Sequence, residues 1–323
     1  MNKIIFILGS GRNGSTLLDM VLNSHSEIFS VGEMDHLEGD IQREKGSYCG
    51  CGIPLKSCPF WNKIWNKIKY QYSISENEFY THPNSEIHKY KRKVQSVYDL
   101  LFSVINIYPN RSHKKFSKRF KEEIYEEIFL EKKVSLVSDS MKDVKRAIRI
   151  SNYLKRKYEF KFIHLVRDGR AVVNSYMKNE EIYYIKNENN ELVKQTVKLT
   201  NTTNTVLDYI NAWKKVNQRI LNYAKTFRSK DYYLIRYEDF TENPEKELKK
   251  LCIFLDIPFE PEMLKLDRFE NHIIRGNPSA KFKAKIIKSA SKTITNNLNS
   301  NDLKLFYSKA GKLNKKFKYS SKL

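Results

Sequence analysis

Residues 3–22 read KIIFILGSGRNGSTLLDMVL, in which an apolar run, three closely spaced glycines and an amphipathic run follow one another directly. Ile4–Leu8 has the composition of a buried strand, and Ser15–Asn23 is predicted to form a helix with one apolar stripe. Between them, residues 9–14 supply the glycines of a tight loop. A strand, a glycine-rich loop and a helix can cradle a phosphate, because the loop N–H groups and the helix N-terminus face the anion.

The loop departs from that of nucleotide triphosphatases at one position. Gly9 and Gly14 have the spacing of a Walker A motif, which continues with lysine and then serine or threonine. Here Ser15 stands where the lysine is expected, and Thr16 follows. That lysine would contact the β- and γ-phosphates of a nucleotide. A loop that lacks it and carries Arg12 instead is expected to hold a different phosphorylated donor.

The loop sequence GSGRNGSTLL resembles the 5′-phosphosulfate loop of sulfotransferases that use 3′-phosphoadenosine 5′-phosphosulfate (PAPS) as the donor. The resemblance implies a set of loop residues that bind this donor: Gly11, Arg12, Asn13, Gly14, Ser15 and Thr16. It also implies that Arg12 contacts the sulfuryl oxygens.

A second short strand, Phe29–Val31, is predicted to end at Gly32 and Glu33. A carboxylate at the end of a strand beside a phosphate loop can accept the proton of an acceptor hydroxyl. The local sequence alone favours a surface ion pair for Glu33. The loop, the short helix and Val-Gly-Glu together, however, resemble tyrosylprotein sulfotransferases and a related bacterial family. The resemblance implies that Glu33 is the catalytic base, with the nearby His25 and His36 as alternatives.

Two later strands also lead to candidate donor contacts. Val134–Val137 precedes Lys142, which resembles the lysine that these families place at the leaving phosphate. Phe160–Val166 precedes Arg167, whose planar fork suits a phosphate at the carboxyl end of a parallel strand. The passage LVRDGRAVVNS resembles the sulfotransferase 3′-phosphate motif, which implies that Arg167 and Ser175 bind that phosphate. An arginine–aspartate pair that caps a helix is the alternative.

Two passages nearer the C-terminus complete the expected donor site. The strand Tyr232–Tyr237 leads into a family-like RYED sequence, so Tyr237 is expected to contact the nucleotide. Residues 272–282 contain a Gly-Asn-Pro turn, in which Asn277 and Lys281 are expected to close over the 3′-phosphate. A plain surface turn explains this passage equally well.

The succession of strands and helices predicts a single α/β domain over residues 1–323, with a mainly parallel sheet of the P-loop type flanked by helices. Residues 64–133 are highly charged and lack glycine, so we expect a helical insertion that shapes the acceptor side. Helical patterns occur within it at Val94–Ile107 and Phe120–Leu130. The polar residues 180–204 are expected to form a loop or lid. The basic residues 281–323 are expected to form an electrostatic arm or a solvated end.

The chain carries 59 basic and 37 acidic residues, a net charge of +22. This excess suits a polyanionic partner such as a phosphorylated donor, although a solvated lysine-rich surface also accounts for it. No signature of a nucleic-acid-binding protein occurs, so no nucleic acid partner is expected. No segment approaches the ~18 apolar residues of a membrane helix, and the N-terminal apolar run is too short for a signal peptide. We therefore expect a cytoplasmic protein without a transmembrane segment.

Three of the four cysteines lie close together, at Cys49, Cys51 and Cys58. They could bind a metal, but the sequence offers no obvious fourth ligand and lacks a C-x-x-C pair. Free thiols in a packed turn, or a redox-labile pair, are the favoured interpretation, and no metal is predicted.

The sequence thus predicts a sulfotransferase that moves a sulfuryl group from PAPS to an acceptor hydroxyl without a metal. The hydroxyl is expected on a glycan or glycolipid, with a peptide or a small metabolite as further possibilities. Two alternatives are a P-loop-like nucleotide or small-molecule kinase and a non-catalytic polyanion-binding protein. The missing lysine at Ser15 argues against the kinase. The sequence names neither the acceptor nor the oligomeric state.

Overall fold

The computed structural model describes residues 1–41, 48–71, 111–178, 180–186, 189, 191–198, 204–266, 270–283, 287–289 and 295–320. The chain divides into two compact units, Met1–Cys58 with Lys132–Leu323, and Pro59–Glu131. The smaller unit overlaps most of the helical insertion expected at residues 64–133 but begins five residues earlier. The pattern at Val94–Ile107 lies outside the described residues. The described part of the smaller unit contains α3 (Pro59–Gln71) and most of α5 (Arg111–Lys132). Two ion pairs join these helices: Lys63–Glu131 at 2.7 Å and Lys67–Glu127 at 2.6 Å.

The larger unit is built on a five-stranded sheet in the order β2-β3-β1-β4-β7, and every neighbouring pair is parallel. Its strands are β1 (Lys3–Leu8), β2 (Ile28–Gly32), β3 (Leu136–Lys142), β4 (Glu159–Val166) and β7 (Tyr232–Arg236). The central strand β1 is completely buried from Ile4 to Leu8, as expected for a parallel strand covered on both faces. The predicted α/β fold with a mainly parallel sheet is therefore confirmed.

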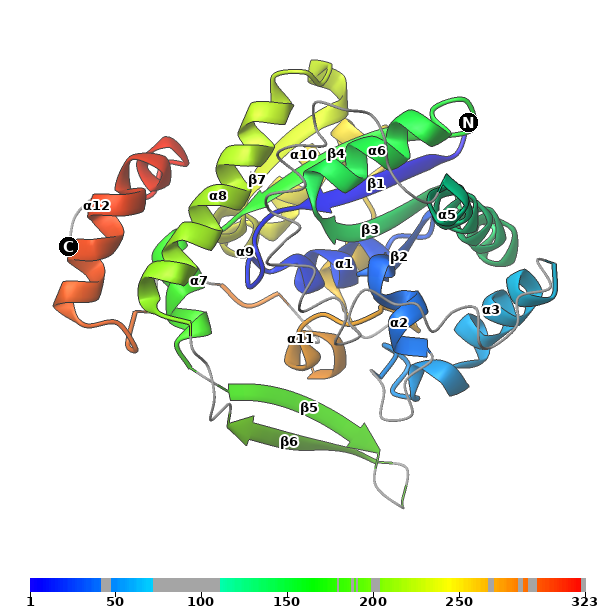
Figure 1. The fold of residues 1–323 in the computed structure, drawn as a ribbon, viewed down its shortest axis with the longest axis horizontal. Coiled ribbons are helices and arrows are strands. Elements are labelled where there is room, and N and C mark those ends of the chain that lie inside the picture. The colour runs from blue at the N-terminus through cyan, green and yellow to red at the C-terminus, as the bar shows by residue number, and fades with distance from the viewer. Residues whose placement is uncertain are drawn as a thin grey trace. The chain divides into compact units, whose positions relative to one another are not determined.

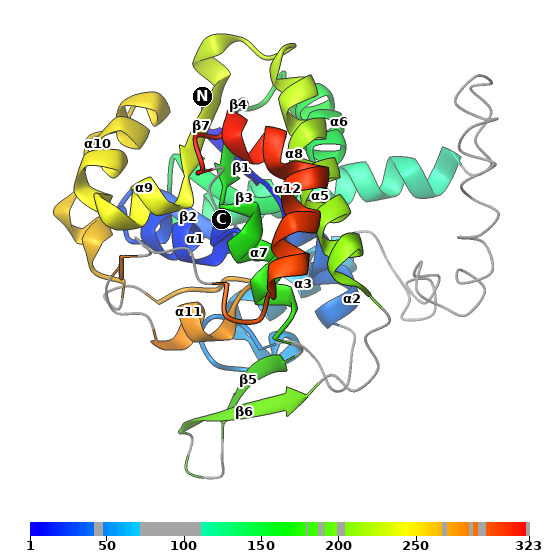
Figure 2. The same ribbon diagram turned by 90° about the vertical axis from the view of Figure 1, so that its left-hand side faces the viewer.

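Helices cover both faces of this sheet. The described helices of this unit, some of which pack on other helices, are α1 (Ser15–Asn23), α2 (Leu37–Ile41), α6 (Val144–Leu154), α7 (Gly169–Tyr176), α8 (Val206–Ala224), α9 (Tyr237–Glu242), α10 (Pro244–Leu255), α11 (Pro278–Lys283) and α12 (Ser300–Lys316). Short 3-10 turns occur at Met34–His36, Leu55–Ser57, Ser229–Asp231 and Pro261–Leu264. Figure 2 shows α1 and α10 on one side of the sheet and α6 and α8 on the other. No helix in the described part of the chain is long and apolar enough to cross a membrane.

The basic C-terminal region is part of the hydrophobic core. Helix α12 packs on α7 and α8, where Phe306, Leu313 and Phe317 join Trp213 in one buried cluster. The expectation of an electrostatic arm or solvated end was therefore wrong for α12. Its lysines alternate with a buried apolar stripe, so a high charge and a packed face occur on the same helix.

Residues 180–204 were expected to form a loop or lid, which was wrong for most of their described part. They contain two antiparallel strands, β5 (Glu180–Lys186) and β6 (Leu192–Lys198), which form a separate hairpin (Figure 1). Tyr184 in β5 is buried, and its ring lies 5.7 Å from that of Phe282 in α11. A short strand in which polar and apolar side chains mix is easily mistaken for a polar loop when only the sequence is read.

Candidate active site

The phosphate loop lies between β1 and α1, and its backbone conformation depends on its glycines. Arg12 and Gly14 both adopt positive φ, at 62° and 95°. A Cβ atom on Gly14 would lie 2.2 Å from Cε2 of Tyr237, and one on Gly9 would lie 2.5 Å from the Leu165 carbonyl oxygen. Left-handed residues in a loop turn successive N–H groups toward one side, which gives a concave site for an anion.

The side chain of Asn13 holds this loop in place rather than facing a ligand. It is almost completely buried. Its Nδ2 donates to the Leu165 carbonyl at 2.9 Å, and its Oδ1 accepts the N–H of Ser15 at 3.1 Å. These bonds tie the loop to β4 and to the first turn of α1. Asn13 can therefore contribute only its backbone to a bound phosphate in this conformation.

Glu33 and Lys142 meet at the carboxyl ends of neighbouring strands. Glu33 follows β2, Lys142 ends β3, and the Lys142 ammonium donates to Oε1 of Glu33. Their side chains keep 18% and 26% of their exposure, so both can reach a bound molecule. Nε2 of His36 lies 3.6 Å from Oε2 of Glu33. Burial, with the charge of Arg275 next, lowers the pKa of His36, which favours a neutral imidazole beside the carboxylate.

Arg167 lies directly against the phosphate loop. Its Nη1 donates to the carbonyl of Arg12 at 3.1 Å, and its guanidinium lies 4.8 Å from the ring centre of Tyr237. Its Nε is buried and has no hydrogen-bond partner among the described residues. The Arg12 guanidinium lies 5.7 Å from the ring centre of Tyr176. The guanidinium groups of Arg12, within the loop, and of Arg167, beside it, thus each lie over a tyrosine ring. Tyr237 also fills the space beside Gly14.

The turn at Gly276 and Asn277 contacts the start of α1. The N–H of Asn277 donates to Oγ1 of Thr16 at 2.8 Å. A Cβ atom on Gly276 would lie 2.6 Å from the same oxygen. The structure therefore places Asn277 beside the phosphate loop, and its expected contact with the 3′-phosphate stays a prediction.

For Ser175 and Lys281, the structure gives no hydrogen bond with the described residues of the phosphate loop. Ser175 is half-buried on α7, two turns after Arg167. Lys281 on α11 is almost fully buried, and its ammonium donates to the carbonyls of Tyr48 at 2.7 Å and Ile273 at 3.4 Å. Burial lowers the pKa of Lys281 to about 8. This ammonium is committed to the turn that begins at Tyr48, so the geometry does not favour its expected contact with a 3′-phosphate.

Two buried acidic residues of this region were missed in the sequence. Asp19 lies within the apolar face of α1, accepts a hydrogen bond from the Ser140 hydroxyl, and burial raises its pKa well above the ordinary value. An acidic residue in an apolar helical stripe was the available signal. Asp40 is fully buried and accepts two hydrogen bonds from Arg275, at 2.6 and 2.8 Å. No local pattern links two residues so far apart in the chain.

A partly open cavity of about 230 Å³ lies beside the loop and Lys142. Its lining comes from the phosphate loop, the end of β3, the start of α6, and α8: Gly9, Gly11, Met141, Lys142, Asp143, Val144, Val216, Arg219 and Ile220. The site therefore combines an anion-binding loop, a carboxylate, a lysine and adjoining space. Such an arrangement can hold a phosphorylated donor and accept a proton from a second substrate.

Comparison with known proteins identifies the family. A family model described as a sulfotransferase domain matches residues 3–305. The sulfotransferase domain of the Synechococcus PCC 7002 olefin synthase has 21% identity and a TM-score of 0.53, over 99% of this chain and 96% of its own. The sulfotransferase domain of the curacin biosynthetic pathway has 21% identity and a TM-score of 0.45, over 97% and 98%. No functionally curated protein matches the chain. The family match spans most of the chain and confirms the resemblance seen in its motifs: the chain belongs to the sulfotransferase family.

Proposed function

We propose that this protein transfers a sulfuryl group from PAPS to a hydroxyl group of an acceptor, with Glu33 as the general base. The observation that carries the proposal is the contact between Glu33 and Lys142 at the ends of β2 and β3, beside a phosphate loop in which Ser15 replaces the lysine of a kinase. Glu33 as a base and Lys142 as a cation would therefore be available at the carboxyl edge of the sheet, where α/β folds of this kind bind their ligands.

The residues around the loop fit a donor with two separate phosphate groups. The loop N–H groups and Thr16 would hold the 5′-phosphate at the N-terminus of α1. Arg167 would hold the 3′-phosphate, and its buried Nε without a partner among the described residues supports an anionic ligand there. Ser175 could add its hydroxyl to the same anion, while Tyr237 would keep the arginine in position through the ring contact. Asn277 would support the loop through Thr16.

The donor supplies the sulfuryl group, and the residues of this chain stabilise the charge that moves during transfer. As the acceptor oxygen bonds to sulfur, its proton passes to Glu33, and the bond between sulfur and the 5′-phosphate oxygen breaks. Arg12 would stabilise the sulfuryl oxygens, and Lys142 the oxygen of the departing phosphate. The products are a sulfate ester and 3′,5′-ADP. Because Lys142 contacts Glu33 without a ligand, its movement toward the donor would leave the carboxylate free to accept the proton.

Among possible acceptors, we propose a hydroxyl on a glycan or glycolipid as the first class to screen. This choice follows from the family resemblance of the motifs. The net charge of +22 would favour acceptors that already carry negative groups.

Donor binding can be tested by thermal unfolding with 3′,5′-ADP, 5′-ADP, and ATP with Mg²⁺. A ligand at ~100 times its dissociation constant stabilises a protein by about 2.7 kcal/mol, which shifts the melting temperature by a few degrees. We expect a shift with 3′,5′-ADP that Arg167→Ala abolishes and Arg228→Ala, an exposed control, retains. A shift only with ATP and Mg²⁺ would refute the proposal in favour of a kinase. A protein that binds polyanions but none of these nucleotides would support the non-catalytic alternative.

The role of Glu33 needs a separate measurement. Glu33→Gln is expected to retain the shift with 3′,5′-ADP but to lower kcat by about 10²–10⁴ in an assay with labelled PAPS, as expected for loss of a general base. Glu245→Gln, which changes an exposed carboxylate on α10, serves as the matched control. Full turnover by Glu33→Gln would contradict the assignment of the base while leaving the donor class intact.

A further inference from the structure

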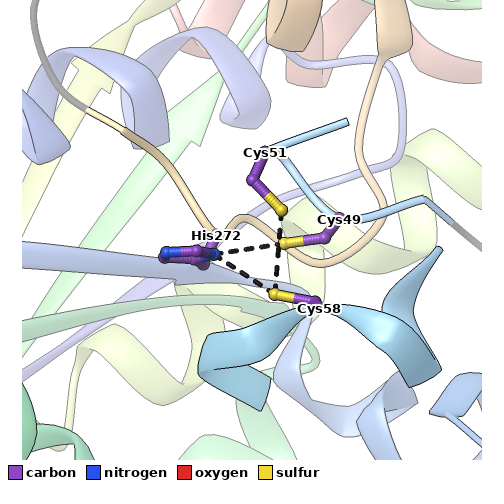
Figure 3. A group of neighbouring side chains, drawn as sticks. All are labelled: Cys49, Cys51, Cys58 and His272. Atoms are coloured by element: carbon purple, nitrogen blue, oxygen red, sulfur yellow. Dashed lines mark hydrogen bonds between the residues drawn. The ribbon is translucent and has the colours of Figure 1, made fainter. Parts of the chain in front are cut away.

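Four side chains outside the reaction site converge on one point. Cys49, Cys51 and Cys58 come from the turn before α3, and His272 comes from the segment before α11 (Figure 3). Sγ of Cys49 and of Cys58 lie 3.5 and 3.3 Å from Nδ1 of His272, and Sγ of Cys51 lies 3.7 Å from Sγ of Cys58. All four donor atoms lie within 4.8 Å of one another.

These separations match those between the ligand atoms of a tetrahedral zinc ion. With Zn–S bonds of about 2.3 Å and Zn–N bonds of about 2.1 Å, tetrahedral angles place two sulfurs about 3.8 Å apart and a sulfur and a nitrogen about 3.6 Å apart. The observed 3.7, 3.5 and 3.3 Å are close to these values. The four donors could therefore enclose an ion with small adjustments of their side chains.

The cluster has the features of a closed structural site. Cys49, Cys58 and His272 are buried, and Cys51 is only partly exposed. The second ring nitrogen of His272, Nε2, lies 3.4 Å from a carboxylate oxygen of Glu270. A carboxylate on the far nitrogen commonly fixes the orientation of a metal-binding histidine. Four protein ligands leave no open position, which is typical of structural rather than catalytic zinc.

The charge of the surroundings also suits a metal centre. A zinc ion with three thiolates and one neutral histidine carries a net charge of −1. Lys281 places a nearly buried ammonium at the Tyr48 carbonyl, next to Cys49. A buried cation needs a nearby negative charge. The carboxylates of Glu33 and Asp40 act on this ammonium, and a metal centre of charge −1 would add to their negative charge.

We propose that Cys49, Cys51, Cys58 and His272 bind one zinc ion that has a structural role. Binding displaces three thiol protons and involves no redox step. This replaces the sequence-based expectation of free thiols or a redox-labile pair without a metal. The sequence offered no fourth ligand because His272 lies 214 residues after Cys58.

The zinc would fasten the cysteine turn to a segment that supports the active site. Directly after His272, the N–H of Ile274 donates to the Val31 carbonyl at 2.9 Å, and its carbonyl accepts the N–H of Glu33 at 3.0 Å. The turn also contacts this segment, since the N–H of Gly50 donates to the Ile273 carbonyl at 3.1 Å. Loss of the ion is therefore expected to loosen the backbone that positions Glu33.

The first test uses the unaltered chain and therefore does not depend on the folding of a variant. Protein purified with zinc present and then dialysed should contain one zinc ion per chain by elemental analysis. Replacement by cobalt should give visible bands of a tetrahedral ion and near-ultraviolet bands of thiolate ligation. Absence of metal with all four thiols reactive after unfolding would overturn the proposal. An intact mass two protons lower, restored by reductant, would overturn it in favour of a disulfide.

Variants then assign the ligands. Cys58→Ser and His272→Ala are expected to lose most of the bound zinc and the tetrahedral cobalt spectrum. Cys252→Ala provides the matched control, because Cys252 is a buried cysteine that contacts Met263 on another part of the fold and should leave one zinc per chain. Full zinc content in both ligand variants would refute this ligand set.

Discussion

Replacement of Gly14 by alanine should destabilise the protein through a contact that the structure defines. Gly14 has φ 95° and ψ 12° at the start of α1. A Cβ atom there would lie 2.2 Å from Cε2 and 2.3 Å from Cδ2 of Tyr237. The left-handed conformation costs an L-residue about 1–2 kcal/mol, and forcing a methyl group into a packed space costs about 1–3 kcal/mol more. Gly14→Ala should therefore lower the free energy of unfolding by about 2–5 kcal/mol.

A double-mutant cycle separates the two contributions. Tyr237→Ala removes the ring, so Gly14→Ala in that background should cost only the backbone term of about 1–2 kcal/mol. Urea unfolding of the four proteins is then expected to give a coupling energy of about 1–3 kcal/mol. The double variant should still bind 3′,5′-ADP poorly, because it lacks the ring that contacts Arg167.

Gly311→Ala is the matched control for this cycle. Gly311 lies within α12, and a Cβ atom there would come no closer than 3.4 Å to Tyr307, which is an ordinary contact. The substitution should be neutral or should stabilise the helix by up to about 1 kcal/mol. Additive effects of Gly14→Ala and Tyr237→Ala, within about 0.5 kcal/mol, would refute the reasoning, because independent sites add in this way.

Three further predictions concern stability. Burial lowers the pKa of His164 in the folded protein to about 4, whereas a histidine in the unfolded chain has a pKa of about 6.5. Between these pH values the unfolded chain binds more protons than the folded protein. The free energy of unfolding should therefore fall by about 2 kcal/mol from pH 7.5 to pH 5. Urea unfolding at both pH values should show a smaller fall for His164→Gln, and an equal fall would contradict this explanation. Arg275→Ala should cost about 3 kcal/mol in urea unfolding, because it removes two charge-assisted hydrogen bonds from the buried carboxylate of Asp40. Adding Asp40→Asn should recover part of the loss, and no recovery would argue against a charge effect. Phe306→Ala should cost about 3–5 kcal/mol in thermal unfolding, since the ring packs in the core, whereas a cost below about 1 kcal/mol would show that α12 is peripheral.

The sequence predicted those parts of the fold whose information is local. Residues 3–22 contain a strand, a loop and a helix start in one passage, and the structure has β1 and α1 in these positions. The buried strand before Arg167 was equally clear in the sequence, because the mainly apolar residues of β4 are followed directly by the charged residues Arg167 and Asp168. The carboxyl ends of parallel strands meet at one edge. Glu33 and Lys142, which were selected from the family resemblance, are in contact at that edge in the structure.

The missed features depend on residues far apart in the chain or on the burial of one face. The bidentate pair of Asp40 and Arg275 joins residues 235 positions apart, and no periodicity reports such a contact. The hairpin of β5 and β6 escaped detection because charged and polar residues are interspersed with apolar ones in both strands, between asparagine-rich passages. The lysine content of α12 similarly concealed a buried stripe that becomes evident only when Trp213 is seen to pack against it.

The segment from His272 to Lys281 shows how a short passage near the C-terminus contacts both the phosphate loop and the end of β2 at Glu33. His272 joins the cysteine turn, Ile274 pairs with β2 next to Glu33, and Asn277 donates to Thr16 at the start of α1. Each contact is modest, because a typical hydrogen bond contributes about 1 kcal/mol to stability. The contacts occur within the six consecutive residues 272–277 of one backbone, so displacement at one end is expected to disturb the others. The proposed base and the proposed phosphate site are therefore expected to respond together when this segment moves.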